Sequence, residues 1–276
     1  MTIRESDIMS DGAVRLYRQR EDLPFTAENL VTIKAPFASL ARMPMAFASA
    51  FKKEAEAASV HSYAWNPEFG YVTARPDICG TGLEISALFH LEGLHLIGDL
   101  NPVLNAFTAL RLEAKGCSGG GMRDAAHLFR LKNTYQLGLD EQGLLARVSR
   151  VFADLVSQES NARIRLVTEF PRVFEDAIER SLAILRACRL ISEWELLDIV
   201  SPLRIAAELN FLDHFTRDEA LSITRERISL PDPFAYAPGT YEEQKERDAH
   251  DALLADKVNK RFRNVKLSAR GKDYLS

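Results

Sequence analysis

The sequence predicts an α+β fold, in which an antiparallel sheet flanked by helices is followed by a helical C-terminal part. Between residues 63 and 135, β-rich segments are joined by connections that suit an antiparallel sheet better than repeated βαβ units. After Gly138, apolar residues recur at helical spacing. The chain has 276 residues, which is enough to bury a core of its own.

The composition is that of an ordinary globular protein. Hydrophobic residues make up 46%, charged residues 27%, and the formal net charge is -4. Because a dedicated nucleic-acid protein needs an overall basic field, we do not expect nucleic acid as a partner. The most apolar stretch, 85–100, is too short and too polar to span a membrane. A polar start without a secretory signal and three distant cysteines favour the cytoplasm.

The first half of the chain alternates between the two kinds of structure. Alanine-rich residues 46–58 predict a short surface helix. Three segments rich in β-formers predict strands, at 70–76, 84–91 and 125–131. The spacing of apolar residues predicts a helix over 101–112.

The second half predicts helices only. Apolar stripes run along 144–156 and 173–185. Three further helices are predicted from capping boxes, formed by Ser192 with Glu195, Thr216 with Glu219, and Thr240 with Glu243. Residues 230–239 are a proline-rich linker. The expected regions are an N-terminal segment 1–60, an α+β body 61–138 that includes parts of 1–60, a helical region 139–230, and a last helix with a basic tail 240–276.

Two glycine clusters are candidate phosphate cradles. They are the turn at residues 80–82 and the loop at 116–121, which follows Lys115. Neither has a P-loop or dinucleotide pattern, so from spacing alone each suits a connection between strands better. No histidines or cysteines have metal-ligand spacing, and we expect no metal. We expect His90 and His95 to be packed, hydrogen-bonded histidines.

Residues 63–83, Tyr-Ala-Trp-Asn-Pro-Glu-Phe-Gly-Tyr-Val-Thr-Ala-Arg-Pro-Asp-Ile-Cys-Gly-Thr-Gly-Leu, resemble the signature block of the ATP:guanido phosphotransferases. The similarity is greatest to the bacterial protein-arginine kinase branch. It continues through 115–121, 129–133, 137–138, 158–163, 185–193 and 197–204. The resemblance implies the guanido-kinase catalytic fold and Mg-ATP as the cofactor if nucleotide binding persists.

This sequence departs from the family pattern at positions with which the family binds its nucleotide. By that resemblance, Ala13 and Glu84 stand where the family has arginine, and Lys115 replaces a third arginine. The other degenerate positions are Arg75 for a thiol, Ile78 for asparagine, Gly120 for glutamate and Arg123 for an acidic residue. Phosphoryl transfer depends on charge neutralisation, and losing one transition-state arginine can cost about 10³–10⁵ in rate. We therefore interpret the site as degenerate.

Some possible nucleotide ligands remain. The candidates are Arg15, Arg18, Gly80, Thr81, Gly82, Lys115, Gly116 and Gly119. Arg75 and Glu84 could instead form an ion pair that closes the old pocket, or surface residues could simply have replaced the site.

Residues 246–252 resemble the Arg-Asp-x-x-Arg-Ala motif with which protein-arginine kinases bind phosphoarginine. Arg247 and Asp248 match this motif, whereas Asp251 replaces its second arginine. The alternative is a solvated helix start. The basic tail 257–272 could meet an acidic partner or RNA, or be a solvated face.

The leading hypothesis is a protein-arginine-kinase-like pseudokinase that acts by binding. Its partner would be a phosphoarginine-bearing protein, an active arginine kinase or a protease adaptor. The alternatives are an active phosphotransferase that uses Arg15, Arg18, Lys115 and Arg75, or a structural subunit that forms homo-oligomers.

Overall fold

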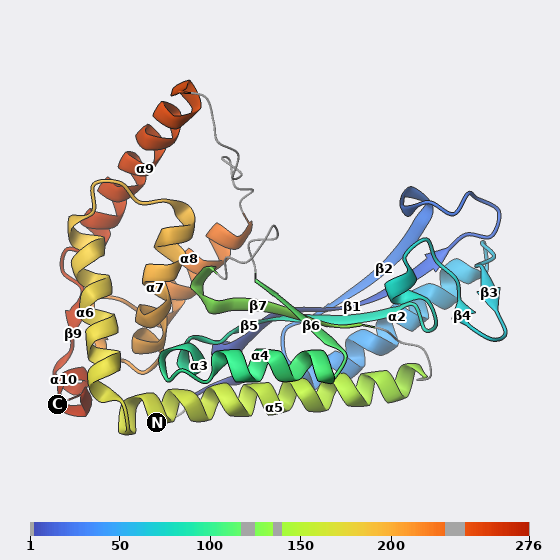
Figure 1. Ribbon diagram of the computed structural model, residues 1–276, viewed down its shortest axis with the longest axis horizontal. Helices are drawn as coiled ribbons and strands as arrows, with labels where there is room; N and C mark the ends of the chain where they lie inside the picture. The colour runs from blue at the N-terminus through green and yellow to red at the C-terminus, as the bar shows by residue number, and fades with distance from the viewer. Residues whose placement is uncertain (1–2, 117–124, 135–139, 230–240, 276) are drawn as a thin grey trace.

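The computed structural model describes residues 3–116, 125–134, 140–229 and 241–275. Its centre is a five-stranded antiparallel sheet with the strand order β2-β1-β5-β7-β6. The strands are β1 (Met9–Gln19), β2 (Leu30–Phe37), β5 (Leu83–His90), β6 (Leu112–Gly116) and β7 (Leu128–Asn133). A short hairpin, β3 (Trp65–Asn66) and β4 (Gly70–Tyr71), lies beyond one end of the sheet (Figure 1). The α+β prediction is confirmed.

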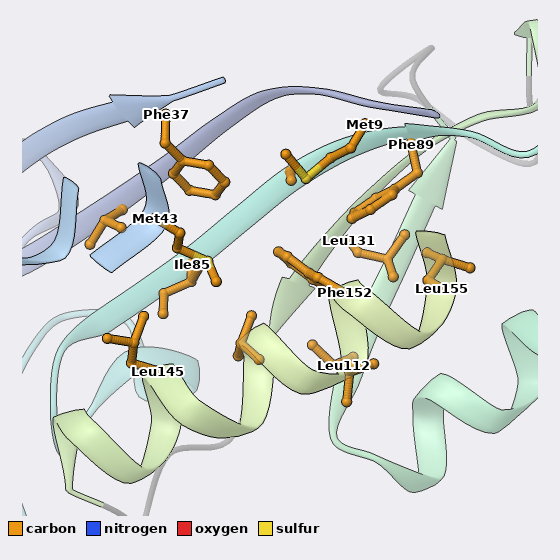
Figure 2. Packing of buried hydrophobic residues seen from close by; sticks show 14 of the residues in the cluster. Met9, Phe37, Met43, Ile85, Phe89, Leu112, Leu131, Leu145, Phe152 and Leu155 are labelled. Carbon is orange, nitrogen blue, oxygen red and sulfur yellow. The ribbon is translucent and has the colours of Figure 1, made fainter. Parts of the chain in front are cut away.

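Helices cover one face of the sheet (Figure 1). They are α2 (Met43–Ala58), α4 (Leu100–Ala109) and the first half of α5 (Glu141–Thr168), with the short α1 (Glu5–Ile8) and α3 (Glu92–Leu96) nearby. Alternate residues of β5, such as Ile85 and Phe89, point into this core because side chains alternate along a strand. Figure 2 shows Phe89 against Phe152, whose ring centroid is 5.0 Å away. The other face of the sheet carries polar and charged side chains such as Glu84 and Lys132, and at one end its Leu88 and Leu128 pack against Leu197.

The C-terminal part has a second core. Its elements are α6 (Pro171–Ala187), α7 (Glu193–Glu208), α8 (Arg217–Ser229), α9 (Tyr241–Phe262), α10 (Ala269–Leu275) and the two-residue strands β8 (Leu212–Asp213) and β9 (Lys266–Leu267). Helix α5 joins the two cores, since Ala162 packs in the first and Leu166 in the second. The helical region therefore shares its first helix with the sheet. None of the helices in the described ranges is long and apolar enough to cross a membrane.

A buried polar network fills the boundary between the two cores. Arg163 donates from Nε to Glu159 (2.7 Å) and from Nη1 to Glu208 (2.6 Å), and its Nη2 lies 3.0 Å from His90 Nδ1. Because arginine only donates, His90 accepts at Nδ1, and its other nitrogen lies 2.8 Å from Ser201 Oγ. Burial lowers the pKa of His90, which agrees with a neutral ring. Hydrogen bonds from three elements thus join the two cores.

Most predicted elements are confirmed. The strand 84–91 is β5, the helix 101–112 is α4, and the two apolar stripes belong to α5 and α6. The capping box at Thr216 forms with both hydrogen bonds, and Ser192 caps its helix by accepting from the backbone N–H of Glu195. Thr240 and the linker 230–239 lie outside the described residues.

Three local predictions were wrong. The strand predicted at 125–131 begins only at Leu128, because His127 has a φ of 50° and cannot continue a strand. The strand 70–76 is limited to β4, since Pro76 lacks an N–H and opens a 3₁₀ turn (Pro76–Ile78). Helix α2 is no simple surface helix, because it buries Phe47 and Ala50 against the sheet.

The two histidines differ in setting. His90 is buried and hydrogen-bonded, as predicted. His95 is exposed and stacks on His127, with ring centroids 3.6 Å apart, so the prediction that it is packed inside was wrong.

Candidate functional site

The polar face of the sheet brings together charged residues from four strands. Arg15 on β1 lies directly opposite Glu84 on β5, and Ser86 lies opposite Lys132 on β7. Lys132 in turn lies opposite Glu113 on β6. Residues paired in this way share one face of an antiparallel sheet, so their side chains lie side by side.

Glu84 is at the centre of this face. Its carboxylate accepts a hydrogen bond from Arg15 Nη1 at 3.0 Å and lies 3.4 Å from the Tyr17 hydroxyl. The side-chain nitrogens of Arg75 and Lys132 are both 4.0 Å from its other oxygen. Burial and the Glu84 charge raise the pKa of Tyr17, so the phenol stays protonated. One carboxylate therefore interacts with three cations.

The outer cations of this face have carboxylate partners of their own. Arg75 pairs with Asp77 at 2.6 Å, so the expected pair with Glu84 forms only as a weaker second contact. Lys115 and Lys132 lie 2.8 and 3.0 Å from Glu113. Burial alone would raise the pKa of Glu113, but hydrogen bonds from these two lysines lower it. Arg15, Arg75, Lys115 and Lys132 thus face three carboxylates, which leaves one net positive charge.

Arg18 lies apart from this face. Its side chain is fully buried, pairs with Glu54 of α2, and donates from Nη1 to the carbonyl oxygen of Thr81 at 3.0 Å. The ring of Tyr71 stacks on its guanidinium group with the centroid 3.6 Å away. Arg18 therefore has a structural environment, with no exposed surface for a nucleotide.

The first glycine turn is shaped around Arg18. Gly82 has a φ of 59°, and a Cβ there would lie 2.4 Å from Arg18 Nη1. Gly80 pairs with Tyr71, and Thr81 is buried. All three residues of this turn therefore contact other parts of the protein or are buried.

The remaining sequence candidates are dispersed or not described. Gly116 ends β6 beside Lys115, and Ala13 and Ile78 are buried. Gly119, Gly120 and Arg123, together with most of the second glycine loop, lie outside the described residues.

The two phosphoarginine candidates are on α9, far along the chain from the sheet. Asp248 is exposed and accepts a hydrogen bond from Gln244 at 2.7 Å, whereas Arg247 is half-buried. Consecutive helical residues point about 100° apart, so the two side chains leave the helix in different directions. In the part of the chain that is described, no group of three or more His, Cys, Asp or Glu side chains could hold a metal ion.

Sequence reasoning missed four members of the charged face, Ser86, Asp77, Glu113 and Lys132. A signal was present: Glu84 and Ser86 alternate with the buried Leu83, Ile85 and Ala87, which is the pattern of a strand with one polar face. The same period places Lys132 beside the buried Leu131.

The charged face does not fit Mg-ATP. A nucleotide triphosphate needs converging cations and donors, whereas Glu84 places a negative charge among Arg15, Arg75 and Lys132. Lys115 keeps the positive charge but lacks the planar guanidinium group of arginine. It also forms an ion pair with Glu113. The face is therefore a cluster of ion pairs in which each of these cations already has a carboxylate partner.

Comparisons with known proteins point to one family. The sequence profile described as ATP:guanido phosphotransferase, C-terminal catalytic domain, matches residues 37–162. A protein-arginine kinase of Listeria monocytogenes serotype 4b is 34% identical over 158 residues, which cover 57% of this chain and 46% of that protein. A protein-arginine kinase of Exiguobacterium sp. is 33% identical over 204 residues, covering 73% and 59%. The chain thus spans about half the length of the curated relatives it matches.

Two solved kinase structures are similar to part of this chain. Lombricine kinase has a TM-score of 0.41 at 14% identity, covering 57% of this chain and 67% of that one. The duplicated taurocyamine kinase from Schistosoma mansoni has a TM-score of 0.43 at 12% identity, covering 56% and 33%. Arg15, Arg18, Arg247 and Asp248 all lie outside the profile match. Residues 37–162 thus match the catalytic domain of the ATP:guanido phosphotransferase family, and the chain is similar over this region to bacterial protein-arginine kinases.

Proposed function

We propose that this chain is a pseudokinase of the protein-arginine kinase branch, which acts in the cytoplasm by binding another protein. The observation that carries the proposal is the Glu84 carboxylate, which lies 3.0 Å from Arg15 and 4.0 Å from Arg75 and Lys132. By the family resemblance an arginine would stand at this position. Replacing it with glutamate both removes a cation and repels phosphate.

The competing function is an active phosphotransferase with a rearranged site. It would need Arg15, Arg18, Lys115 and Arg75 as replacement phosphate ligands. Arg18 is buried against Glu54, and the other three are engaged by carboxylates. Each would have to give up an ion pair before it could contact a nucleotide, which favours the pseudokinase.

We further propose that the bound partner is a phosphoarginine-bearing protein, an active arginine kinase or a protease adaptor, and that the chain forms homo-oligomers. Arg247 and Asp248 are the proposed phosphoarginine ligands. The exposed carboxylate of Asp248 can accept from a guanidinium group, and an arginine can hold a phosphoryl group. A purely structural role in oligomers is the remaining alternative.

Titration calorimetry with Mg-ATP, together with a radiolabelled assay of protein arginine phosphorylation, tests the missing activity. We expect no binding tighter than about 1 mM, which corresponds to about 4 kcal/mol, and no phosphoarginine product. Micromolar Mg-ATP affinity with phosphorylation that Lys115→Ala abolishes would overturn the proposal. Lys245→Ala, an exposed lysine on α9, is the matched control.

Thermal shift with phosphoarginine and arginine tests the binding role. We expect phosphoarginine alone to stabilise the protein, and Asp248→Ala to remove that shift. Glu246→Ala replaces a neighbouring exposed carboxylate on the same helix and should leave the shift unchanged. Equal thermal shifts with phosphoarginine in Asp248→Ala and Glu246→Ala would show that Asp248 is not part of the binding site.

A further inference from the structure

We propose that a pocket between α6 and α9 binds a phosphoryl group. The pocket has a volume of about 280 Å³. It is lined by Arg186 of α6, by Asp256, Asn259 and Lys260 of α9, and by Arg263, which directly follows α9. Three cations from two parts of the chain, all of them exposed side chains, thus line the pocket together with one carboxylate. The pocket belongs to the helical part, so the inference goes beyond the ion-paired sheet face and does not depend on it.

The pocket cations have no carboxylate partner in the part of the chain that the structure describes. Among the described residues, no Asp or Glu oxygen lies within 4.0 Å of the side-chain nitrogens of Arg186, Lys260 or Arg263. Arg261, the residue after Lys260, pairs with Glu219 and is thereby neutralised. Within the basic tail noted in the sequence, Arg261 is therefore paired, whereas Lys260 and Arg263 line the pocket.

A helix end alone explains only part of this arrangement. Cations are favoured in the last turn of α9 by the helix dipole, which accounts for Lys260. Arg186 comes from a different helix, from which it donates to carbonyl groups at the end of α9 and also lines this pocket. The convergence of separate elements is what an anion site requires.

The pocket walls are fixed by hydrogen bonds. Arg186 donates to the carbonyl oxygens of Phe262 and Val265, so it satisfies carbonyl groups at the end of α9 that would otherwise repel an anion. Asn259 donates from Nδ2 to the Cys188 carbonyl oxygen at 3.0 Å. These bonds tie α9 to the end of α6 before any ligand binds, which reduces the ordering cost of binding.

Size and donor geometry select the ligand. A pocket of about 280 Å³ lies at the small end of ligand sites, so it suits one anionic head group better than a nucleotide. Arginine and lysine donors converging on one small volume match a tetrahedral anion with three terminal oxygens better than a row of separate carboxylates. Thirteen residues separate Lys260 from Arg247, or about 20 Å along α9, so this pocket is distinct from the proposed phosphoarginine position.

Calorimetric titration of the full chain with inorganic phosphate, in a phosphate-free buffer of low ionic strength, tests the site. We expect Lys260→Ala to weaken binding about threefold and Lys260→Ala with Arg263→Ala to weaken it about tenfold. Lys245→Ala removes the same charge from the opposite end of α9 and should leave the affinity unchanged. Asp256→Asn removes the one repulsive charge and should tighten binding about threefold.

Each alternative result has a defined meaning. Equal weakening by Lys245→Ala, no tightening by Asp256→Asn, or no phosphate binding by the native chain would overturn the proposal, provided that circular dichroism shows folded variants. Tighter binding of a hexaglutamate peptide than of phosphate would overturn it in favour of an acidic protein surface. Phosphoserine titrated in parallel identifies the source: tighter binding than phosphate supports a phosphorylated side chain, and weaker binding supports free phosphate.

Discussion

The polar face of the sheet and the pocket between α6 and α9 contain similar cations in opposite settings. On the sheet, Arg15, Arg75, Lys115 and Lys132 each have a carboxylate within 3.0 Å. In the pocket, three cations face the single carboxylate of Asp256, and none pairs with it or with another described carboxylate. The position of the carboxylates, more than the number of cations, decides which region can attract an anion.

The largest expected difference between the regions is in stability. Glu54→Ala would leave Arg18 buried without its carboxylate, and we expect a loss of about 3–5 kcal/mol in the free energy of unfolding. Asp256→Ala removes an exposed carboxylate from the pocket and should change stability by less than about 0.5 kcal/mol. Denaturant unfolding of both variants measures the contrast.

A matched pair of variants controls this prediction. Glu54→Gln retains the volume and a hydrogen-bond acceptor and should lose less stability than Glu54→Ala. Comparable losses from Glu54→Ala and Asp256→Ala would show that the two regions do not differ in this way.

The next effect is a gain of binding. Glu84→Arg replaces the central carboxylate with a cation beside Arg15, Arg75 and Lys132, so the sheet face should acquire affinity for tripolyphosphate. We expect at least about a tenfold increase over the native chain, which corresponds to about 1.4 kcal/mol. Titration calorimetry measures it.

The control for that variant separates local charge from net charge. Glu179→Arg makes the same charge change at an exposed position on α6. If it raised tripolyphosphate affinity as much as Glu84→Arg, the sheet face would not be the binding surface.

The sequence predicted β5 and the position of Glu84 well, because a strand with one buried face has a fixed two-residue period. The partner of Glu84 was harder to predict. The pair with Arg15 depends on the register of two strands almost seventy residues apart, and that register is set by three-dimensional packing. Arg75 is closer in sequence, yet a local carboxylate, Asp77, takes most of its contacts.

Buried charge was the other limit. Arg18 has the sequence context of a ligand-binding arginine, and only the packing of α2 and the β3–β4 hairpin shows that it is enclosed. The Glu159–Arg163 pair had a readable signal, since the two residues are four apart on a helix. The sequence did not indicate that this pair is buried between two cores, because that burial requires α7 and β5 to meet there.

The smallest expected effect is the pH dependence of the sheet face. Lys115 and Lys132 lower the pKa of Glu113, so this group stabilises the folded chain above its ordinary pKa near 4.5 and loses that contribution as the pH falls through the lowered value. Because Glu113 is about one-third exposed, its contribution is screened, and Lys132→Ala should remove less than about 1 kcal/mol at neutral pH. The same substitution should flatten the decline in stability below about pH 4.5. Lys260→Ala, which removes a cation without a carboxylate partner among the described residues, should leave that acid decline as in the native chain. Denaturant unfolding across this pH range would contradict the comparison if both variants flattened the decline equally.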